Sequence, residues 1–483
     1  GSQQRKAGAE VEPELVPEDA ERPSPGAIGL AVALLENRAD EGEVLLHMRP
    51  IVSPLLVTLR RLMEYFDGSL HIDNLSATEL AERYGTPLYV YDAAVIRRQI
   101  ANIREAFSGL PFRPFYAMKA NGNLSILRLV REQGFGCDAV SPGEIQLSLR
   151  AGFEPENIWF TCSNVSDEDL RAIPDPRIVL NVNSMAEIDR CLSLDLANPI
   201  ALRVNPDVGA GHHADVITAG DSVKFGIDLA EIDSARMLVE DAGRKLTGIH
   251  AHIGSGVDTP APLLDAARCL LELAPSFRNL KWVNFGGGIA TPYRPGDSEF
   301  PLAEYGAELS RIAGAMLRAR DLTAIIEPGR YLVAQSGILL ARVTTKRISA
   351  GLEWIGVDTG FNHLVRPSKY GAYHHIVNAS RGSAGSLRAS WDAEAQREEL
   401  VVAGNLCESG DVFTRTEGKV TARRMDPTKV GDLIGFCDTG AYGFSMASHY
   451  NARLLPPEIL IENGQARVIR ARQPMDDLLR GME

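Results

Sequence analysis

The feature that most constrains the fold is a strand-then-helix unit that occurs eight times in succession. Each unit begins with a short apolar or β-branched run and ends in polar or glycine-rich residues. The runs are Pro114–Met118, Cys137–Val140, Ile158–Thr161, Ile178–Val182, Ile200–Val204, Gly248–Ile253, Trp282–Phe285 and Ala324–Ile326. This rhythm predicts an α/β fold with a (β/α)8 TIM barrel, in which functional residues collect at the carboxyl ends of the strands. A doubly wound open sheet alternates in the same way but rarely extends to eight units.

The rest of the chain divides around this barrel, which we expect over residues 93–331. Residues 1–68 are interpreted as an N-terminal extension, partly disordered, because residues 1–26 are rich in Glu, Pro and Ala. A helix-like pattern over residues 54–66 leaves a docked helix and a mobile arm equally open. Residues 69–92 contain strand-like segments and a short helix, opened by a capping box at Ser76 and Glu79, that we expect to join the second domain. Long β-like runs, the first at Leu332–Thr344, predict a mainly β C-terminal domain over residues 332–483.

Composition excludes several classes of protein. The 483 residues carry a net charge of −13, which disfavours nucleic acid and anionic membranes as partners. No apolar run approaches the ~18 residues that a membrane helix needs. The six cysteines are scattered without a C-x-x-C pair, so we expect no metal site or disulfide framework, and a cytoplasmic location fits.

Lys119 ends the first barrel strand, within Phe-Tyr-Ala-Met-Lys-Ala-Asn. A lysine there would be partly desolvated, which we expect to lower its pKa and free its amine for imine formation. A solvated lysine at a strand end is the alternative, and for one lysine in isolation it is the commoner case.

Three further strand ends suggest a cofactor site. Gly286-Gly287-Gly288 would let backbone N–H groups close around a phosphate, although a simple tight turn is the alternative. Ser255 could add a hydroxyl to that phosphate, and His252 could lie flat against an aromatic cofactor. Glu327 could keep a pyridine nitrogen protonated, or could instead be a loop glutamate paired with Arg330. Together these signals place the parts of one cofactor site on one face of the barrel.

These residues belong to a longer series of ordered motifs. The series is Tyr116-Ala-Met-Lys119-Ala-Asn, Cys137-Asp138-Ala-Val-Ser141-Pro-Gly-Glu144, Lys224-Phe-Gly-Ile227, His252-Ile-Gly-Ser255, Gly286-Gly-Gly288, Glu327-Pro-Gly-Arg330, Cys407-Glu408-Ser-Gly-Asp411 and Gly440-Ala-Tyr442-Gly. With them, roughly residues 70–480 resemble the fold-type III pyridoxal-phosphate decarboxylases, which pair an alanine-racemase-like barrel with a β domain. Within that family the resemblance is closest to the diaminopimelate decarboxylases.

The resemblance implies a role for each matched residue. Lys119 would be the Schiff-base lysine of pyridoxal 5'-phosphate, Glu327 would contact the ring nitrogen, and His252 would stack on the ring. Ser255, Gly287, Gly288 and Tyr442 would hold the phosphate. The remaining cofactor-binding positions are Asp138, Gly329 and Arg330.

The implied reaction is decarboxylation of meso-2,6-diaminopimelate to L-lysine, the last step of lysine biosynthesis. Substrate-binding positions are Arg330, Arg366, Tyr370, Glu408 and Tyr442. Arginine binds a carboxylate through two parallel hydrogen bonds, so Arg330 and Arg366 suit the second carboxylate, and Glu408 suits the second ammonium. The alternative is that Arg366 and Glu408 form a surface ion pair.

Cys407 matches a cysteine that is delivered across a dimer interface to the partner's active site. The resemblance therefore implies a homodimer with composite sites, in which Cys407 or an acid that it relays to protonates Cα. A small buried thiol is the alternative, and Cys162, Cys191, Cys269 and Cys437 keep that interpretation.

Three departures from the family pattern leave other functions open. They are Gly256 where glutamine is usual, Lys369 where an apolar residue is common, and Asn405-Leu406 before Cys407. A decarboxylase acting on another carboxylated or carrier-bound amino acid is one alternative, and a non-catalytic binding protein is another. An alanine racemase is disfavoured because that class lacks the Cys-Glu-Ser-Gly-Asp segment.

Overall fold

The computed structural model describes residues 63–211, 213, 217–220, 223–388, 397–416 and 418–482. Parallel strands in the order β9-β11-β12-β13-β5-β6-β7-β8 form a sheet that closes where β8 pairs with β9. They are β5 (Phe112–Ala117), β6 (Gly136–Ala139), β7 (Ile158–Thr161), β8 (Val179–Val182), β9 (Ile200–Asn205), β11 (Leu246–His250), β12 (Trp282–Asn284) and β13 (Thr323–Ile326). The predicted barrel is confirmed, and each strand end lies within three residues of its predicted position.

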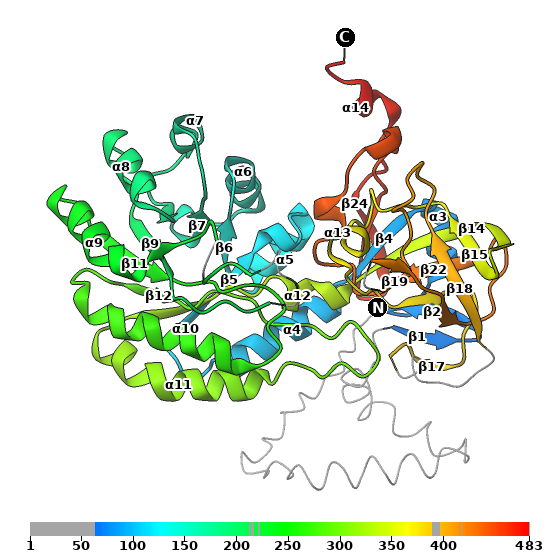
Figure 1. The fold of residues 1–483 in the computed structure, drawn as a ribbon, viewed down its shortest axis with the longest axis horizontal. Helices are drawn as coiled ribbons and strands as arrows, with labels where there is room; N and C mark the ends of the chain where they lie inside the picture. Colours follow the sequence, from blue (N-terminus) through cyan, green and yellow to red (C-terminus); the bar gives the residue numbers. More distant parts are fainter. Residues whose placement is uncertain are drawn as a thin grey trace, which may run out of the picture. The chain divides into compact units, whose positions relative to one another are not determined.

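Helices cover the outside of the barrel (Figure 1). They are α4 (Ala93–Ala106), α5 (Leu124–Glu132), α6 (Pro142–Ala151), α7 (Asp167–Arg171), α8 (Met185–Ser193), α9 (Ile232–Asp241), α10 (Pro260–Leu273) and α11 (Leu302–Ala319). Asn123, Ser141 and Ser184 cap α5, α6 and α8 by accepting backbone N–H bonds. Some of the polar residues after the strands therefore start the next helix, as N-cap residues do.

The barrel interior changes from apolar to polar along the strands. Phe115, Trp159, Val179, Ala201 and Ile325 form one buried apolar cluster. Because side chains alternate along a strand, the residues two positions further on point the same way. Four of the five positions are polar and buried, at Thr161, Asn181, Arg203 and Glu327, and the fifth is Ala117. The barrel thus has an apolar floor beneath a polar layer at its carboxyl end.

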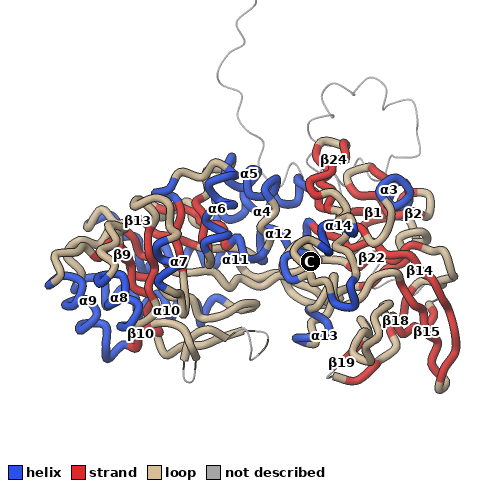
Figure 2. The backbone as a smooth tube through the Cα atoms, turned by 90° about the horizontal axis from the view of Figure 1, so that it is seen from above, coloured by secondary structure: helices blue, strands red, loops and turns tan. Residues whose placement is uncertain are grey.

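The second domain is built mainly of strands, as predicted (Figure 2). Its large sheet has the order β21-β18-β15-β14-β4-β23-β24, with β22 and β16 branching from β14. The strands are β4 (Leu88–Asp92), β14 (Gly337–Ser349), β15 (Leu352–Val357), β16 (Ile376–Asn378), β18 (Glu398–Ala403), β21 (Arg423–Met425), β22 (Leu433–Phe436), β23 (Glu458–Glu462) and β24 (Gln465–Arg470). Strand β4 precedes the barrel in sequence, yet it pairs with β14 and β23.

A small sheet lies at the start of the described chain, with the order β17-β1-β2-β3. Its strands are β1 (Met63–Phe66), β2 (Ser69–Ile72), β3 (Leu75–Ser76) and β17 (Gly385–Ser386). The helix-like pattern over residues 54–66 was wrong for its last four residues, which are β1, because that segment finds strand partners in β2 and β17. The rest of that pattern, and residues 1–62 of the predicted extension, lie outside the described residues.

Two further details of the sequence prediction were wrong. Helix α3 (Ala77–Tyr84) does begin after Ser76, but the Ser76 side chain makes no cap bond, and its hydroxyl lies 3.2 Å from the Ser69 hydroxyl. Strand β14 starts at Gly337, because the preceding residues form α12 (Arg330–Val333) and a 3-10 turn, Ala334–Ser336. An apolar run that is buried on every side fits a helix as well as a strand, so periodicity cannot separate them.

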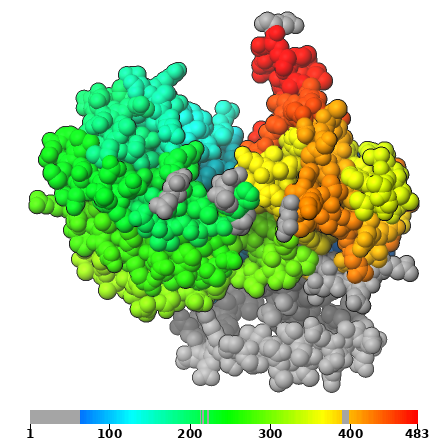
Figure 3. Space-filling model, viewed as in Figure 1, coloured from blue at the N-terminus to red at the C-terminus, as the bar shows by residue number. Residues whose placement is uncertain are grey.

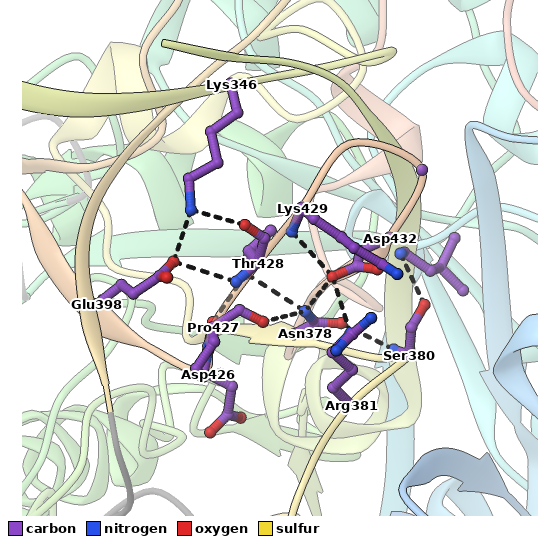
Figure 4. Close-up of polar contacts among 12 residues, drawn as sticks. Lys346, Asn378, Ser380, Arg381, Glu398, Asp426, Pro427, Thr428, Lys429 and Asp432 are labelled. Atoms are coloured by element: carbon purple, nitrogen blue, oxygen red, sulfur yellow. Dashed lines mark hydrogen bonds and ion pairs between the residues drawn. The ribbon is translucent and has the colours of Figure 1, made fainter. Parts of the chain in front are cut away.

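Polar contacts hold the loops of the β domain together (Figure 4). Asn378 donates to the Asp432 carboxylate at 2.9 Å. The Glu398 carboxylate accepts from the Lys346 amine at 2.8 Å and from the Thr428 N–H at 3.1 Å. These bonds satisfy polar groups that the β domain would otherwise leave without partners.

The C-terminal segment stands out from the β domain (Figure 3, red). Its short helix α14 (Met475–Leu479) leaves Met475 and Leu479 about half exposed. Among the described helices, none has the length and apolar character required to cross a membrane.

Candidate active site

A cavity of about 440 Å³ lies at the carboxyl ends of the barrel strands, where the β domain meets the barrel. The β domain contacts this region directly, since Tyr442 N–H donates to the Ala120 carbonyl at 2.8 Å. Predicted site residues that line the cavity are Lys119, His252, Ser255, Gly288, Glu327, Gly329, Arg330, Arg366, Tyr370 and Tyr442. The predicted residues Asp138, Gly287, Cys407 and Glu408 are not part of its lining.

Lys119 lies on the 3-10 turn Met118–Ala120 that follows β5, and its amine is 3.7 Å from the Asp138 carboxylate. Asp138 is 1% exposed, and neither of its oxygens has a hydrogen-bond partner among the described residues. Burial lowers the pKa of Lys119, but electrostatic interaction with its acidic neighbours, Asp138 foremost and Glu327 among them, raises it more. The expected depression of the lysine pKa was therefore wrong, and the pKa of Lys119 lies above its ordinary value.

Glu327 is the last link of a buried polar chain. Asn284 Nδ2 donates to Glu327 Oε1 at 2.5 Å, and His250 Nε2 lies 3.3 Å from Oε2. Asn181 Nδ2 donates to His250 Nδ1 at 2.9 Å, so the imidazole proton sits on Nε2 and faces the carboxylate. Burial raises the pKa of Glu327, but His250 and Asn284 lower it more, and the net shift is downward. The alternative pairing of Glu327 with Arg330 was wrong.

The glycine loop after β12 approaches the cavity with backbone alone. Gly288 has φ +105°, and a Cβ there would stand 2.5 Å from the Gly254 carbonyl oxygen, so only glycine fits. Gly287 N–H donates to His252 Nδ1 at 3.2 Å, which leaves the His252 proton on Nε2. The loop therefore supports the ring of His252 as well as bordering the cavity.

Two buried arginines, Arg330 and Arg366, also line the cavity. Arg330 donates to the Ser255 hydroxyl through Nε at 3.2 Å and Nη2 at 2.8 Å, and to the Tyr293 hydroxyl at 3.1 Å. Arg366, which is 2% exposed, donates to His374 Nε2 at 2.8 Å and lies 4.7 Å from the Tyr293 ring. In the described part of the chain, neither guanidinium has an acidic partner. A second cavity, of about 610 Å³, also borders both arginines and Tyr370.

Cys407 and Glu408 lie elsewhere on the surface. Both are exposed, with Cys407 N–H donating to Asn451 Oδ1 at 2.7 Å and Glu408 accepting from the Tyr450 hydroxyl at 3.2 Å. The buried-thiol interpretation of Cys407 was therefore wrong. So was the ion pair between Arg366 and Glu408, because each has a different partner.

Comparisons with known proteins agree with this geometry. Residues 93–334 match the family model described as pyridoxal-dependent decarboxylase, pyridoxal binding domain. Diaminopimelate decarboxylase of Methanothermobacter thermautotrophicus is 40% identical, over 86% of this chain and 95% of that protein. The Escherichia coli K12 enzyme is also 40% identical, over 86% of this chain and 97% of that protein. The chain belongs to the diaminopimelate decarboxylase family.

Solved structures of diaminopimelate decarboxylases share the fold. One superposes with a TM-score of 0.75 at 39% identity, covering 86% of this chain and 97% of that one. The M. jannaschii diaminopimelate decarboxylase in complex with L-lysine also gives a TM-score of 0.75, at 32% identity, covering 86% of this chain and 96% of that one. This member of the family is accordingly a pyridoxal-phosphate-dependent carboxy-lyase.

The residues present fit that cofactor. An amine, a deeply buried ionised carboxylate and a glycine-lined wall border one cavity, at Lys119, Glu327 and Gly288. Pyridoxal phosphate carries an aldehyde, a pyridine nitrogen and a phosphate, which are the complementary groups. Asp138 lies 3.7 Å from the amine, and burial together with the charge of Glu327 raises the pKa of this carboxyl to about 7.

The sequence analysis missed Arg203, which also lines the cavity of this enzyme. Its guanidinium lies 4.5 Å from the Phe225 ring, and burial lowers the pKa of Arg203 to about 10. The sequence did contain a signal, because Arg203 is the single charged residue in the apolar run Ile200–Val204. A buried charge needs polar partners, so a charged residue in a barrel strand indicates a polar interior beside it.

Proposed function

We propose that this enzyme releases CO₂ from meso-2,6-diaminopimelate and forms L-lysine. The observation that carries the choice of substrate is the pair Arg330 and Arg366, two buried guanidiniums that line the cavity with no acidic partner in the described part of the chain. A buried cation requires an anion beside it. The second carboxylate of diaminopimelate supplies one.

The remaining residues divide between the cofactor and the substrate. Pyridoxal phosphate, when bound, supplies a ring that accepts the electron pair left on Cα as CO₂ departs. Lys119 holds the cofactor through its amine, Glu327 keeps a proton on the ring nitrogen, and His252 packs against the ring face. Ser255, Gly287, Gly288 and Tyr442 would hold the phosphate, Gly329 borders the same cavity, and Asp138 and Arg330 would complete the cofactor site.

Arg330 and Arg366 bind the carboxylate at the end of the substrate that does not react. Each guanidinium can do so with two parallel hydrogen bonds. Tyr370 and Tyr442 border the same space. A ligand without that carboxylate leaves two cations unpaired, so the site discriminates against simple diamines and monocarboxylic amino acids.

We also propose a homodimer in which Cys407 of the partner subunit returns a proton to Cα and Glu408 of the partner subunit binds the second ammonium. Exposure of both residues, away from the cavity of their own chain, supports this arrangement. The six unpaired cysteines suit the reducing cytoplasm, where we place the enzyme.

The activity test uses the holoenzyme with meso-diaminopimelate and measures CO₂ and L-lysine. We expect equimolar products, and none from Lys119→Ala. Release of CO₂ from another carboxylated or carrier-bound amino acid, with none from diaminopimelate, would refute the substrate and retain the chemistry.

The composite site is tested by co-expressing Lys119→Ala with Cys407→Ala. Each variant alone should be nearly inactive, whereas random pairing restores one intact site in half of the dimers, giving about a quarter of wild-type activity. Sites built within single chains would give no restoration.

A further inference from the structure

We propose that His374 is a positioning residue that aims Arg366 at the second carboxylate of the substrate and so helps to determine specificity. This inference rests on the proposed function and names a residue that acts through Arg366.

His374 makes one hydrogen bond from each ring nitrogen. Arg366 Nη1 lies 2.8 Å from His374 Nε2, and the Cys437 carbonyl oxygen lies 2.8 Å from Nδ1. Guanidinium N–H groups only donate and a carbonyl oxygen only accepts. The proton of His374 therefore sits on Nδ1, and Nε2 presents its lone pair to Arg366.

The neutral state of this imidazole is secured by its surroundings. His374 is 1% exposed, and burial together with the positive charges of Arg366, Arg423 and Arg330 holds its pKa well below the usual value. A proton on Nε2 would place two donors against each other. His374 thus stays an acceptor for Arg366 at any pH at which the enzyme works.

Arg366 needs such a support because its own helix gives it little. It is the first residue of α13 (Arg366–Tyr370), a single turn at the edge of the cavity. The ring of Tyr293 covers the guanidinium and also meets His374 edge-on at 5.3 Å between ring centres. With one N–H taken by His374 and one face taken by Tyr293, the remaining donors have a restricted direction, which lowers the ordering cost of binding a carboxylate.

The adjacent histidine provides a matched control. His375 is also buried and its Nδ1 lies 3.1 Å from the Tyr373 hydroxyl, whereas the ring nitrogen that meets Arg366 belongs to His374. Replacing His374 or His375 by asparagine removes a similar buried volume from adjacent positions of the chain. A difference between the two variants therefore reports on the contact with Arg366.

The experiment compares holoenzyme variants at saturating pyridoxal phosphate. His374→Asn keeps a donor near the Cys437 carbonyl but loses the acceptor for Arg366, whereas the longer His374→Gln can restore that acceptor. His375→Asn is the control. For each we measure kcat and KM with meso-diaminopimelate, and the inhibition constants of L-lysine, which keeps the second carboxylate, and of 1,5-diaminopentane, which lacks it.

We expect His374→Asn to raise KM roughly tenfold with kcat changed far less, the loss typical of one hydrogen bond to a charged group. The inhibition constant of L-lysine should rise in parallel with KM, that of 1,5-diaminopentane should stay near wild type, and His374→Gln should recover most of the KM. An unchanged KM in His374→Asn, or an equal rise in His375→Asn, would overturn the proposal. If His374→Asn fails to fold, failure of folded His374→Gln to keep a near-wild-type KM would also overturn it. Absence of activity in the wild-type holoenzyme would instead refute the proposed function.

Discussion

At the residue scale, the charge of Glu327 is fixed by neighbours on three other barrel strands. Asn181 sets the tautomer of His250, which then presents an N–H to the carboxylate, and Asn284 donates to its other oxygen. Each of these donors favours the ionised form. A carboxylate that stays ionised in a dry site is suited to holding a proton on a pyridine ring.

Glu327→Gln tests that charge with little change of shape. We expect kcat to fall by about 10²-fold or more, because an oriented charge at the reacting ring is lost. Steady-state kinetics with the fully loaded enzyme measures the effect. Glu398→Gln, which alters an ion pair in the β domain, is the control and should keep wild-type kcat.

His363 provides a pH-dependent test of stability. Burial, together with the charges of Arg472 and Arg453, lowers the pKa of His363 to about 4. The unfolded chain takes up this proton near the ordinary histidine value while the folded chain does not, so stability is lost as pH falls through that interval.

His363→Gln should remove this dependence. Between about pH 8 and about pH 5, the wild type should lose about 2 kcal/mol of unfolding free energy that the variant does not lose. The variant, less stable at pH 8, should therefore come closer to the wild type at pH 5 by that amount. Denaturant unfolding at both values measures the change, and parallel pH curves for the two proteins would contradict it.

The sequence located residues that lie together where a side chain sits at a strand end. Lys119, Glu327 and Arg330 line one cavity because a barrel brings strand ends together, and their roles stay a prediction. His374 lies eight positions after Arg366 in a segment without periodic pattern, so no local signal links the two. Their contact depends on the path of the chain between α13 and β16.

At the element scale, the eight barrel strands were predictable because each is a short run buried on both faces, between polar loops. The start of β14 was not, because residues 332–334 are equally apolar but fold, with residues 335 and 336, as helical turns. The polar interior layer follows from period-two alternation once the strands are placed, and it would have located Asn181 and Arg203.

A substitution at Gly248 tests the packing of the barrel strands. The absence of a side chain at this position leaves space for the Trp159 ring in the apolar floor of the barrel. A Cβ there would stand 2.8 Å from Trp159 Cη2 and 3.1 Å from Ala201 Cβ. We expect Gly248→Ala to cost about 1–3 kcal/mol of unfolding free energy through overpacking, with altered Trp159 emission.

Gly143→Ala is the matched control for that substitution. The atom nearest to a Cβ added at Gly143 would be Ser141 Oγ, at 3.7 Å. Gly143 lies in the first turn of α6. We expect no loss of stability there, and a gain of up to about 1 kcal/mol from helix propensity. Equal destabilisation in both variants would show that steric crowding is not the cause.

At the scale of the whole described molecule, the largest apolar cluster extends through both the barrel and the β domain, and each domain also has a smaller cluster of its own. A single cluster contains Phe107 and Leu309 from barrel helices together with Leu339, Val402 and Phe436 from β strands. Buried Glu458 of β23 adds polar links, accepting from Tyr91 at 2.7 Å and from Asn123, the cap of α5, at 2.9 Å.

We therefore expect the two domains to unfold together. Thermal transitions followed by Trp159 in the barrel and Trp354 in the β domain, in variants that isolate each emission, should coincide. Glu458→Gln should cost roughly 1–3 kcal/mol of unfolding free energy. Both midpoint temperatures should therefore fall by the same amount. Two separate midpoints would contradict a shared core.

Helix α13 has an evolutionary consequence. On the roles proposed above, its single turn, Arg366–Tyr370, carries part of the substrate recognition, whereas Lys119 and Glu327 follow barrel strands far away in the sequence. A few substitutions in this short stretch can therefore change which amino acid is accepted and leave the residues around the cofactor intact. Recognition of the substrate and the chemistry of the reaction can then change independently of each other.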